Sequence, residues 1–166
     1  WRTSHHWAGK AFGGWNLAGS AILDRGTPIN VTSSATWPRG DFNADGSGGD
    51  RPNAPINGVS VGGWDKQQFL QGIFRPSDFP TPAPGTDGAL GRNAFRGPGF
   101  AQVDLSLSKR FSLTERVTAQ IRADAFNALN RVNLANPVMD LANNNFGRST
   151  STLTPRLMQL GLRMEF

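Results

Sequence analysis

Cysteine is absent from the 166-residue chain, and no long apolar run occurs in it. Without cysteine there is no disulfide, no thiolate zinc site and no thiol nucleophile. A membrane helix requires about 18 consecutive apolar residues, so the sequence predicts none. Apolar residues make up 37% of the chain, and the mean hydropathy is -0.39. These values resemble those of a soluble protein, but the strands of a membrane barrel also give a weak hydropathy signal.

The chain also lacks an initiator methionine and the charged and apolar segments of a signal peptide. We therefore expect either a processed N-terminus or a piece of a longer polypeptide. The net charge is +5, but the basic residues are scattered, and Lys109-Arg110 is their only adjacent pair. This distribution does not favour a nucleic-acid partner.

Polar and apolar residues alternate along three segments, as they do in strands with two different faces. In residues 100–111 the apolar set includes Val103, Leu105 and Leu107, and residues 116–126 continue the alternation after the short turn "SLTE". The third segment is the closing "RLMQLGLRMEF". Each segment has about the 9–11 residues with which a tilted strand crosses a bilayer. An edge strand in a soluble sheet is the alternative.

The rest of the chain is mainly turn-forming. Residues 12–32 read as extended, whereas residues 34–99 show no sustained period and are rich in glycine, proline, asparagine and aspartate. Within them only "DKQQFLQGIF" resembles a helix, with Phe69, Leu70 and Ile73 on one face. We predict strands near residues 12–32, 100–111, 116–126 and 156–166, and a long loop over residues 34–99.

Several motifs carry a family resemblance. "GRNAFRGPG" (91–99), "RADAFNALNRVN" (122–133), the loop "GDFNADGSGGDRPN" (40–53) and the terminal aromatic residue Phe166 resemble the C-terminal end of a TonB-dependent outer-membrane receptor. The chain is more narrowly similar to the Oar-like group, whose members carry a carboxypeptidase-regulatory-like domain. The predicted fold is therefore all-β: over residues 1–166, an antiparallel segment of about four strands from a transmembrane barrel, with long irregular extracellular loops.

The resemblance implies a bacterial outer-membrane location, energy-coupled uptake of a ligand, and a plug inside the barrel. The expected partners are outer-membrane lipid, the remaining barrel strands and plug, and the TonB complex, which would act through segments missing from this chain. The terminal strand would present an assembly signal to the barrel-inserting machinery, formed by Leu160, Leu162, Met164 and Phe166. Barrels of this kind have about 22 strands, so four strands cannot close or transport alone. The runner-up is a structural or adhesive surface protein that displays loops without transport.

The loop "DFNADGSGGD" places Asp41, Asn43 and Asp45 at the first, third and fifth positions of a calcium-loop pattern. The twelfth position, however, is Pro52 instead of glutamate, and Asp50 could substitute only in another loop geometry. We therefore predict weak or no calcium binding there, and no other cofactor. The alternative is a loop whose carboxylates face water.

The remaining polar residues do not indicate an enzyme. His5 and His6 are adjacent, without a third ligand nearby, so a metal site is not expected. Trp7 and Trp15 could belong to an interfacial aromatic girdle or could be packing residues. The charged residues on the polar face of the strands do not form the arrangement of a nucleophile, a base and an oxyanion donor. We expect these residues to form ion pairs between neighbouring strands: Asp104, Arg122, Asp124, Arg163 and Glu165.

Overall fold

The computed structural model describes residues 12–36 and 39–166. It divides into two compact units. The first, here called the sheet unit, contains Ala101–Val132, Thr154–Phe166 and the described residues up to Leu23. The second, the loop unit, contains Asp24–Phe100 and Asn133–Leu153.

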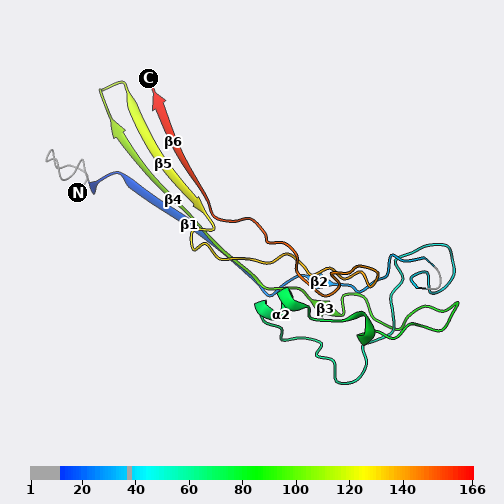
Figure 1. The fold of residues 1–166 in the computed structure, drawn as a ribbon. Helices are drawn as coiled ribbons and strands as arrows, with labels where there is room; N and C mark the ends of the chain where they lie inside the picture. Colours follow the sequence, from blue (N-terminus) through cyan, green and yellow to red (C-terminus); the bar gives the residue numbers. More distant parts are fainter. Residues whose placement is uncertain (1–11, 37–38) are drawn as a thin grey trace. The chain divides into compact units, whose positions relative to one another are not determined.

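Four antiparallel strands form the main sheet, in the order β1-β4-β5-β6 (Figure 1). Their bounds are Trp15–Asp24 for β1, Phe100–Ser112 for β4, Thr118–Phe126 for β5 and Leu157–Glu165 for β6. β4, β5 and β6 lie where the alternating segments predicted strands, and Phe166 lies just beyond the end of β6.

The predicted extended segment over residues 12–32 is interrupted after β1. Gly26 has φ +99°, and its N–H donates to the Asp24 carboxylate. A Cβ at Gly26 would lie only 2.1 Å from the Gly97 carbonyl oxygen, so the turn requires glycine. After this turn Pro28–Ile29 (β2) pairs with Phe95–Arg96 (β3) in a separate two-stranded sheet.

The register across β4, β5 and β6 gathers apolar residues on one face of the sheet and polar residues on the other. Leu107, Ala123 and Leu160 are direct cross-strand neighbours, whereas on the other face Ser106, Asp124 and Gln159 are neighbours. Because successive side chains of a strand point to opposite faces, this register produces one apolar face and one polar face. The predicted separation of the two residue sets is confirmed.

A tight turn joins β4 to β5. The Leu113 and Thr114 N–H groups donate to the Val117 carbonyl, and the Thr114 hydroxyl oxygen accepts the N–H groups of Arg116 and Val117. The threonine side chain thus satisfies the turn's backbone donors.

The loop unit has a buried core that the sequence pattern did not predict. Phe74 lies 4.8 Å from Phe95 and 5.0 Å from Phe79 between ring centroids, and Phe79 lies 5.8 Å from Phe146. Such tilted and edge-on ring pairs are favourable beyond their area burial. Four apolar residues complete this core: Ile29, Val31, Leu90 and Met139. The sequence predicted a long irregular connection with one short helix over residues 34–99, and nothing in it indicated this core.

Within the loop unit, the predicted helix is present as Lys66–Gln71 (α2). Asp65 and Gln68 form a reciprocal capping box, and the helix ends at Gly72. Phe69 is buried and Leu70 is exposed, and Ile73 lies beyond the end of the helix, so the three residues predicted to share one helical face do not do so. A single 3-10 turn follows at Pro76–Asp78.

Candidate functional site

Most large side chains on the apolar face of the sheet are exposed. Leu160 is 81% and Phe166 is 92% exposed, and the other large apolar side chains of β1 and β6 are also exposed. Soluble monomers rarely expose a continuous apolar surface of this kind. The face is therefore suited to an apolar environment such as lipid.

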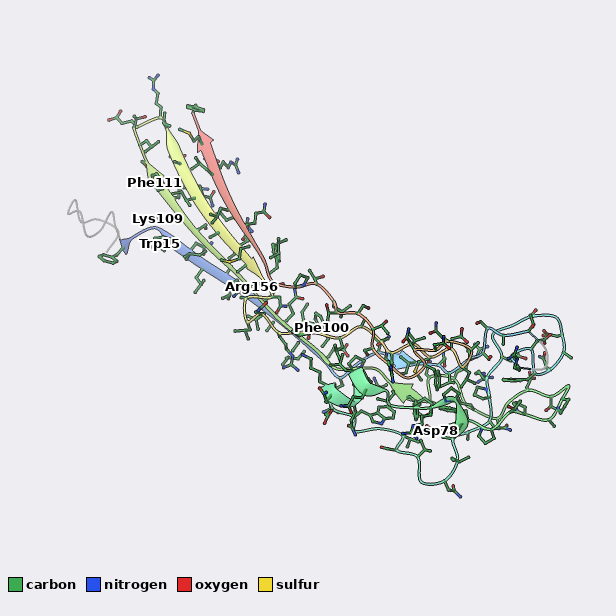
Figure 2. The ribbon with its side chains drawn as sticks, in the orientation of Figure 1. Trp15, Asp78, Phe100, Lys109, Phe111 and Arg156 are labelled. Carbon is green, nitrogen blue, oxygen red and sulfur yellow. The ribbon has the colours of Figure 1, made fainter. Side chains whose placement is uncertain are left out.

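One cation lies on this apolar face. Lys109 is opposite Ile121, and its Nζ lies 4.9 Å from the centroid of the Trp15 ring. Figure 2 shows both side chains on the neighbouring strands β1 and β4. A lysine of this kind keeps its stem on apolar surface and carries its ammonium toward water. The exposed Trp15 ring beside a cation therefore fits the interfacial alternative better than a packing role.

The opposite face carries the charged residues, but they pair differently from the expectation. Arg122 binds Asp124 at 2.9 Å, and Arg163 binds Glu165 at 3.0 Å, so both ion pairs run along a strand. The prediction of cross-strand ion pairs was wrong. Arg122 lies opposite Gly161, and Arg163 lies opposite Gln120, so neither arginine has an acid directly across from it.

Asp104 has a structural role at the end of this polar face. Its carboxylate accepts hydrogen bonds from the Gln102 amide and from the Asn127 N–H. Asn127 is 1% exposed, has φ +50°, and exchanges hydrogen bonds with the Arg131 backbone. The "FNALN" segment is therefore a hydrogen-bonded turn that ends β5.

The outer edges of β1 and β6 are open. β5 is paired on both sides, by β4 and β6, whereas no other described strand pairs with the far edge of β6 or of β1. An open edge in hydrocarbon leaves N–H and C=O groups without partners at a cost of several kcal/mol each. In lipid, the sheet therefore requires further strands at both edges.

The predicted calcium loop is held together by its own carboxylates. Asp41 accepts the N–H groups of Asp45 and Gly46, Asp50 accepts those of Phe42 and Asn43, and Asp45 accepts that of Ser47. Asp41 is also buried. In the part of the chain that the structure describes, no three histidine, cysteine or acidic residues form a group that could hold a metal. His5, His6 and Trp7 lie outside the described residues.

A sheet with one apolar and one polar face is what a membrane barrel requires of its strands. The family model for the Outer membrane beta barrel domain matches residues 1–159 of the chain. The chain belongs to this family. A search of curated proteins found no match, and neither did a search of solved structures. Among the described helices, none is long and apolar enough to cross a membrane.

Membership in the Outer membrane beta barrel domain family places the chain in the bacterial outer membrane. A domain of this family associates with outer-membrane lipid, and the apolar face of the sheet is the face suited to that contact. The matched residues end at Gln159, so the proposed assembly signal, Leu160 to Phe166, lies beyond the match and stays a prediction.

Proposed function

We propose that the chain is the C-terminal part of the barrel of a TonB-dependent outer-membrane receptor of the Oar-like kind. In this proposal the complete protein takes up a ligand through energy-coupled transport. The observation that carries it is the open four-stranded sheet with one apolar and one polar face. Such a sheet is complete only as part of a larger barrel.

The far edges of β1 and β6 bind strands from outside the 166 residues, which belong either to upstream sequence or to a separate subunit. The polar face, with its Arg122–Asp124 and Arg163–Glu165 pairs, lines the lumen beside a plug. These charges are held in ion pairs and hydrogen bonds, so we assign them a structural and not a catalytic role.

The lengths of the connections between strands indicate, for this proposal, the side of the membrane on which the loop unit lies. The turn between β4 and β5 is short, whereas the loop unit connects β1 to β4 and β5 to β6. Outer-membrane barrels have short periplasmic turns and long external loops. The loop unit is therefore extracellular and meets the ligand first.

A surface protein without transport is the alternative. The loop unit favours it in one respect, because it has an aromatic core of its own and does not depend on a plug for a hydrophobic interior. A displayed unit of this kind would suit adhesion as well as uptake.

A crosslinking experiment tests the open edge. Since the chain lacks cysteine, a single benzophenone-labelled cysteine can be placed at Leu162 of β6, and a control at Ile121 of β5. Ile121 has neighbours of the same chain on both sides, Lys109 and Leu162. We expect mass spectrometry to find a crosslink to sequence outside the chain from position 162 only. Crosslinks confined to the chain at both positions would contradict the proposal, as would a folded, water-soluble monomer without detergent.

A TonB-binding measurement distinguishes the proposed transport protein from the alternative, a surface protein that displays loops without transport. The complete protein, isolated from outer membranes, should bind the purified periplasmic domain of TonB saturably. Crosslinking at Leu162 without any TonB binding would support the display protein instead.

A further inference from the structure

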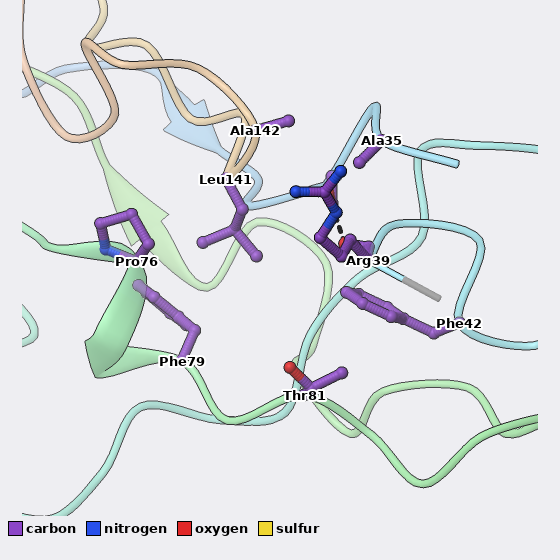
Figure 3. A pocket seen from close by; sticks show the side chains of 9 residues that line it. Ala35, Arg39, Phe42, Pro76, Phe79, Thr81, Leu141 and Ala142 are labelled. Carbon is purple, nitrogen blue, oxygen red and sulfur yellow. Dashed lines mark hydrogen bonds between the residues drawn. The ribbon is translucent and has the colours of Figure 1, made fainter. Parts of the chain in front are cut away.

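The loop unit contains a half-open pocket with a volume of about 460 Å³. That volume lies in the range of about 300–1,000 Å³ in which small-molecule sites occur. Nine residues of this unit line it, and Figure 3 shows their side chains around one space: Ser33, Ala35, Arg39, Phe42, Pro76, Phe79, Thr81, Leu141 and Ala142.

The lining combines an apolar wall with one positive charge. Phe42 and Phe79 are buried residues, and Pro76 and Leu141 lie beside them along the pocket wall (Figure 3). Arg39 is the one charged residue among the nine, and no acidic side chain lines the pocket. An apolar lining with a small number of placed polar groups is the usual composition of a ligand site.

The guanidinium of Arg39 is available to a ligand. Within the described residues it has no hydrogen-bond or ion-pair partner. The three carboxylates next to lining residues in sequence are otherwise engaged: Asp41 accepts the Asp45 and Gly46 N–H groups, Asp78 accepts that of Arg75, and Asp140 accepts those of Ser34 and Ala142. A guanidinium recognises a carboxylate through two parallel hydrogen bonds.

The backbone groups of Arg39 itself are hydrogen-bonded before any ligand binds. Its N–H donates to the Thr36 carbonyl, and its carbonyl accepts the hydroxyl of the buried Ser33 at 3.0 Å. Phe79 is fixed by its ring contacts with Phe74 and Phe146. A site formed in advance loses less conformational entropy on binding.

Thr81 supplies a second polar group. It stands between Pro80 and Pro82, whose fixed φ angles restrict the backbone on both sides. Its side chain lines the pocket below Phe42 and Phe79 in Figure 3. A hydroxyl there can form a hydrogen bond with another polar atom of a ligand.

We propose that this pocket binds a small monocarboxylic acid whose apolar body is about the size of one aromatic ring. The carboxylate binds Arg39, and the body packs against Phe42, Phe79 and Leu141. The proposal goes beyond transport, because it depends on the geometry of the loop unit alone. Failure of TonB binding would leave it standing.

The test measures binding of 4-phenylbutyrate to the full chain in lipid nanodiscs by isothermal titration calorimetry. We expect saturable binding with a Kd of about 1 mM or tighter. The neutral analogue 4-phenylbutanamide should bind at least about tenfold more weakly, because it cannot accept a charge-assisted bond from Arg39. Empty nanodiscs control for partition of the acid into lipid.

Two substitutions in the pocket, each with a control substitution outside it, locate the site. Arg39→Gln should weaken binding about tenfold or more, while Arg131→Gln removes the same charge from the sheet unit and should leave binding unchanged. Ala142→Phe fills the pocket at an exposed position and should abolish binding. Ala54→Phe adds the same ring at an exposed position outside the lining and should not.

Hydrogen exchange of the unmodified chain provides a readout that does not depend on the folding of a variant. The acid should slow exchange at the N–H groups of Arg39, Phe42 and Ala142. Absence of saturable binding, equal affinity for the amide, unchanged binding by both pocket variants, or protection confined to other segments would each overturn the proposal.

Discussion

Leu160 of β6 lies directly opposite Ala123 of β5, and its side chain is 81% exposed. Its neighbour Gln159 lies opposite Asp124 on the other face. These two adjacent positions of one strand therefore lie on the apolar and the polar face of the sheet respectively.

This relationship gives the first prediction. Leu160→Arg should lower the free energy of unfolding in a bilayer by about 2–4 kcal/mol, the cost of a lipid-facing arginine near the midplane. Gln159→Arg is the matched control and should change it little, because the new charge lies beside Asp124. Urea unfolding in lipid vesicles measures both. Equal costs for the two variants would contradict the assignment of the faces.

The second prediction concerns Phe166. Its side chain is exposed just beyond the end of β6 and has no part in the loop-unit core. Deletion of Phe166 should reduce the fraction of protein assembled in the outer membrane, while Phe166→Trp keeps an aromatic ring and should assemble normally. Heat-modifiable mobility of membrane fractions on gels measures assembly. Normal assembly of the deletion variant would exclude a role as a signal.

The third prediction concerns the loop around Asp41. Titration calorimetry with calcium chloride should show weak or no binding, because Asp41 and Asp50 already accept backbone N–H groups. Asp41→Ala should instead lower the free energy of unfolding by about 1–3 kcal/mol, since it leaves loop donors without a partner. A bound ion with oxygen ligands at about 2.3–2.6 Å would show that the prediction is wrong.

The fourth prediction concerns pH. Burial raises the pKa of Asp140, but hydrogen bonds from the Ser34 hydroxyl and from the N–H groups of Ser34 and Ala142 outweigh it, and the net pKa is below the ordinary 3.8. The charged form is thus favoured in the folded state. Its contribution to stability is present above the unfolded value of 3.8 and is lost as the pH falls through the lower folded pKa.

Asp140→Asn should remove this pH dependence. The variant should be less stable than the wild type at neutral pH, and the difference should narrow below about pH 3.8. Thermal unfolding of the loop unit, followed by near-ultraviolet circular dichroism, measures the difference. A difference that is constant from neutral pH to pH 2 would contradict the role of the carboxylate.

The two faces of the sheet followed from sequence because a strand has a period of two residues. The alternation in residues 100–111 and 156–166 already separated Leu107 and Leu160 from Ser106 and Gln159, and the short turn after Ser112 implied a hairpin. A register shifted by one residue would reverse the faces of a strand, so the pattern also constrained the pairing. Such signals are local and can be read along the chain.

The loop unit could not be predicted in this way. Its core joins Phe74, Phe79 and Phe95 to Met139 and Phe146, which stand far apart in a sequence without a period. Spacing placed Asp41, Asn43 and Asp45 in a calcium-loop pattern for which weak or no binding was predicted, but it did not indicate that Asp41 and Asp50 accept the N–H groups of the loop itself. The sequence by itself determined the strands and their faces, because alternation acts between near neighbours. Only the tertiary structure decided the aromatic core and the pocket around Arg39, because these depend on which distant residues meet.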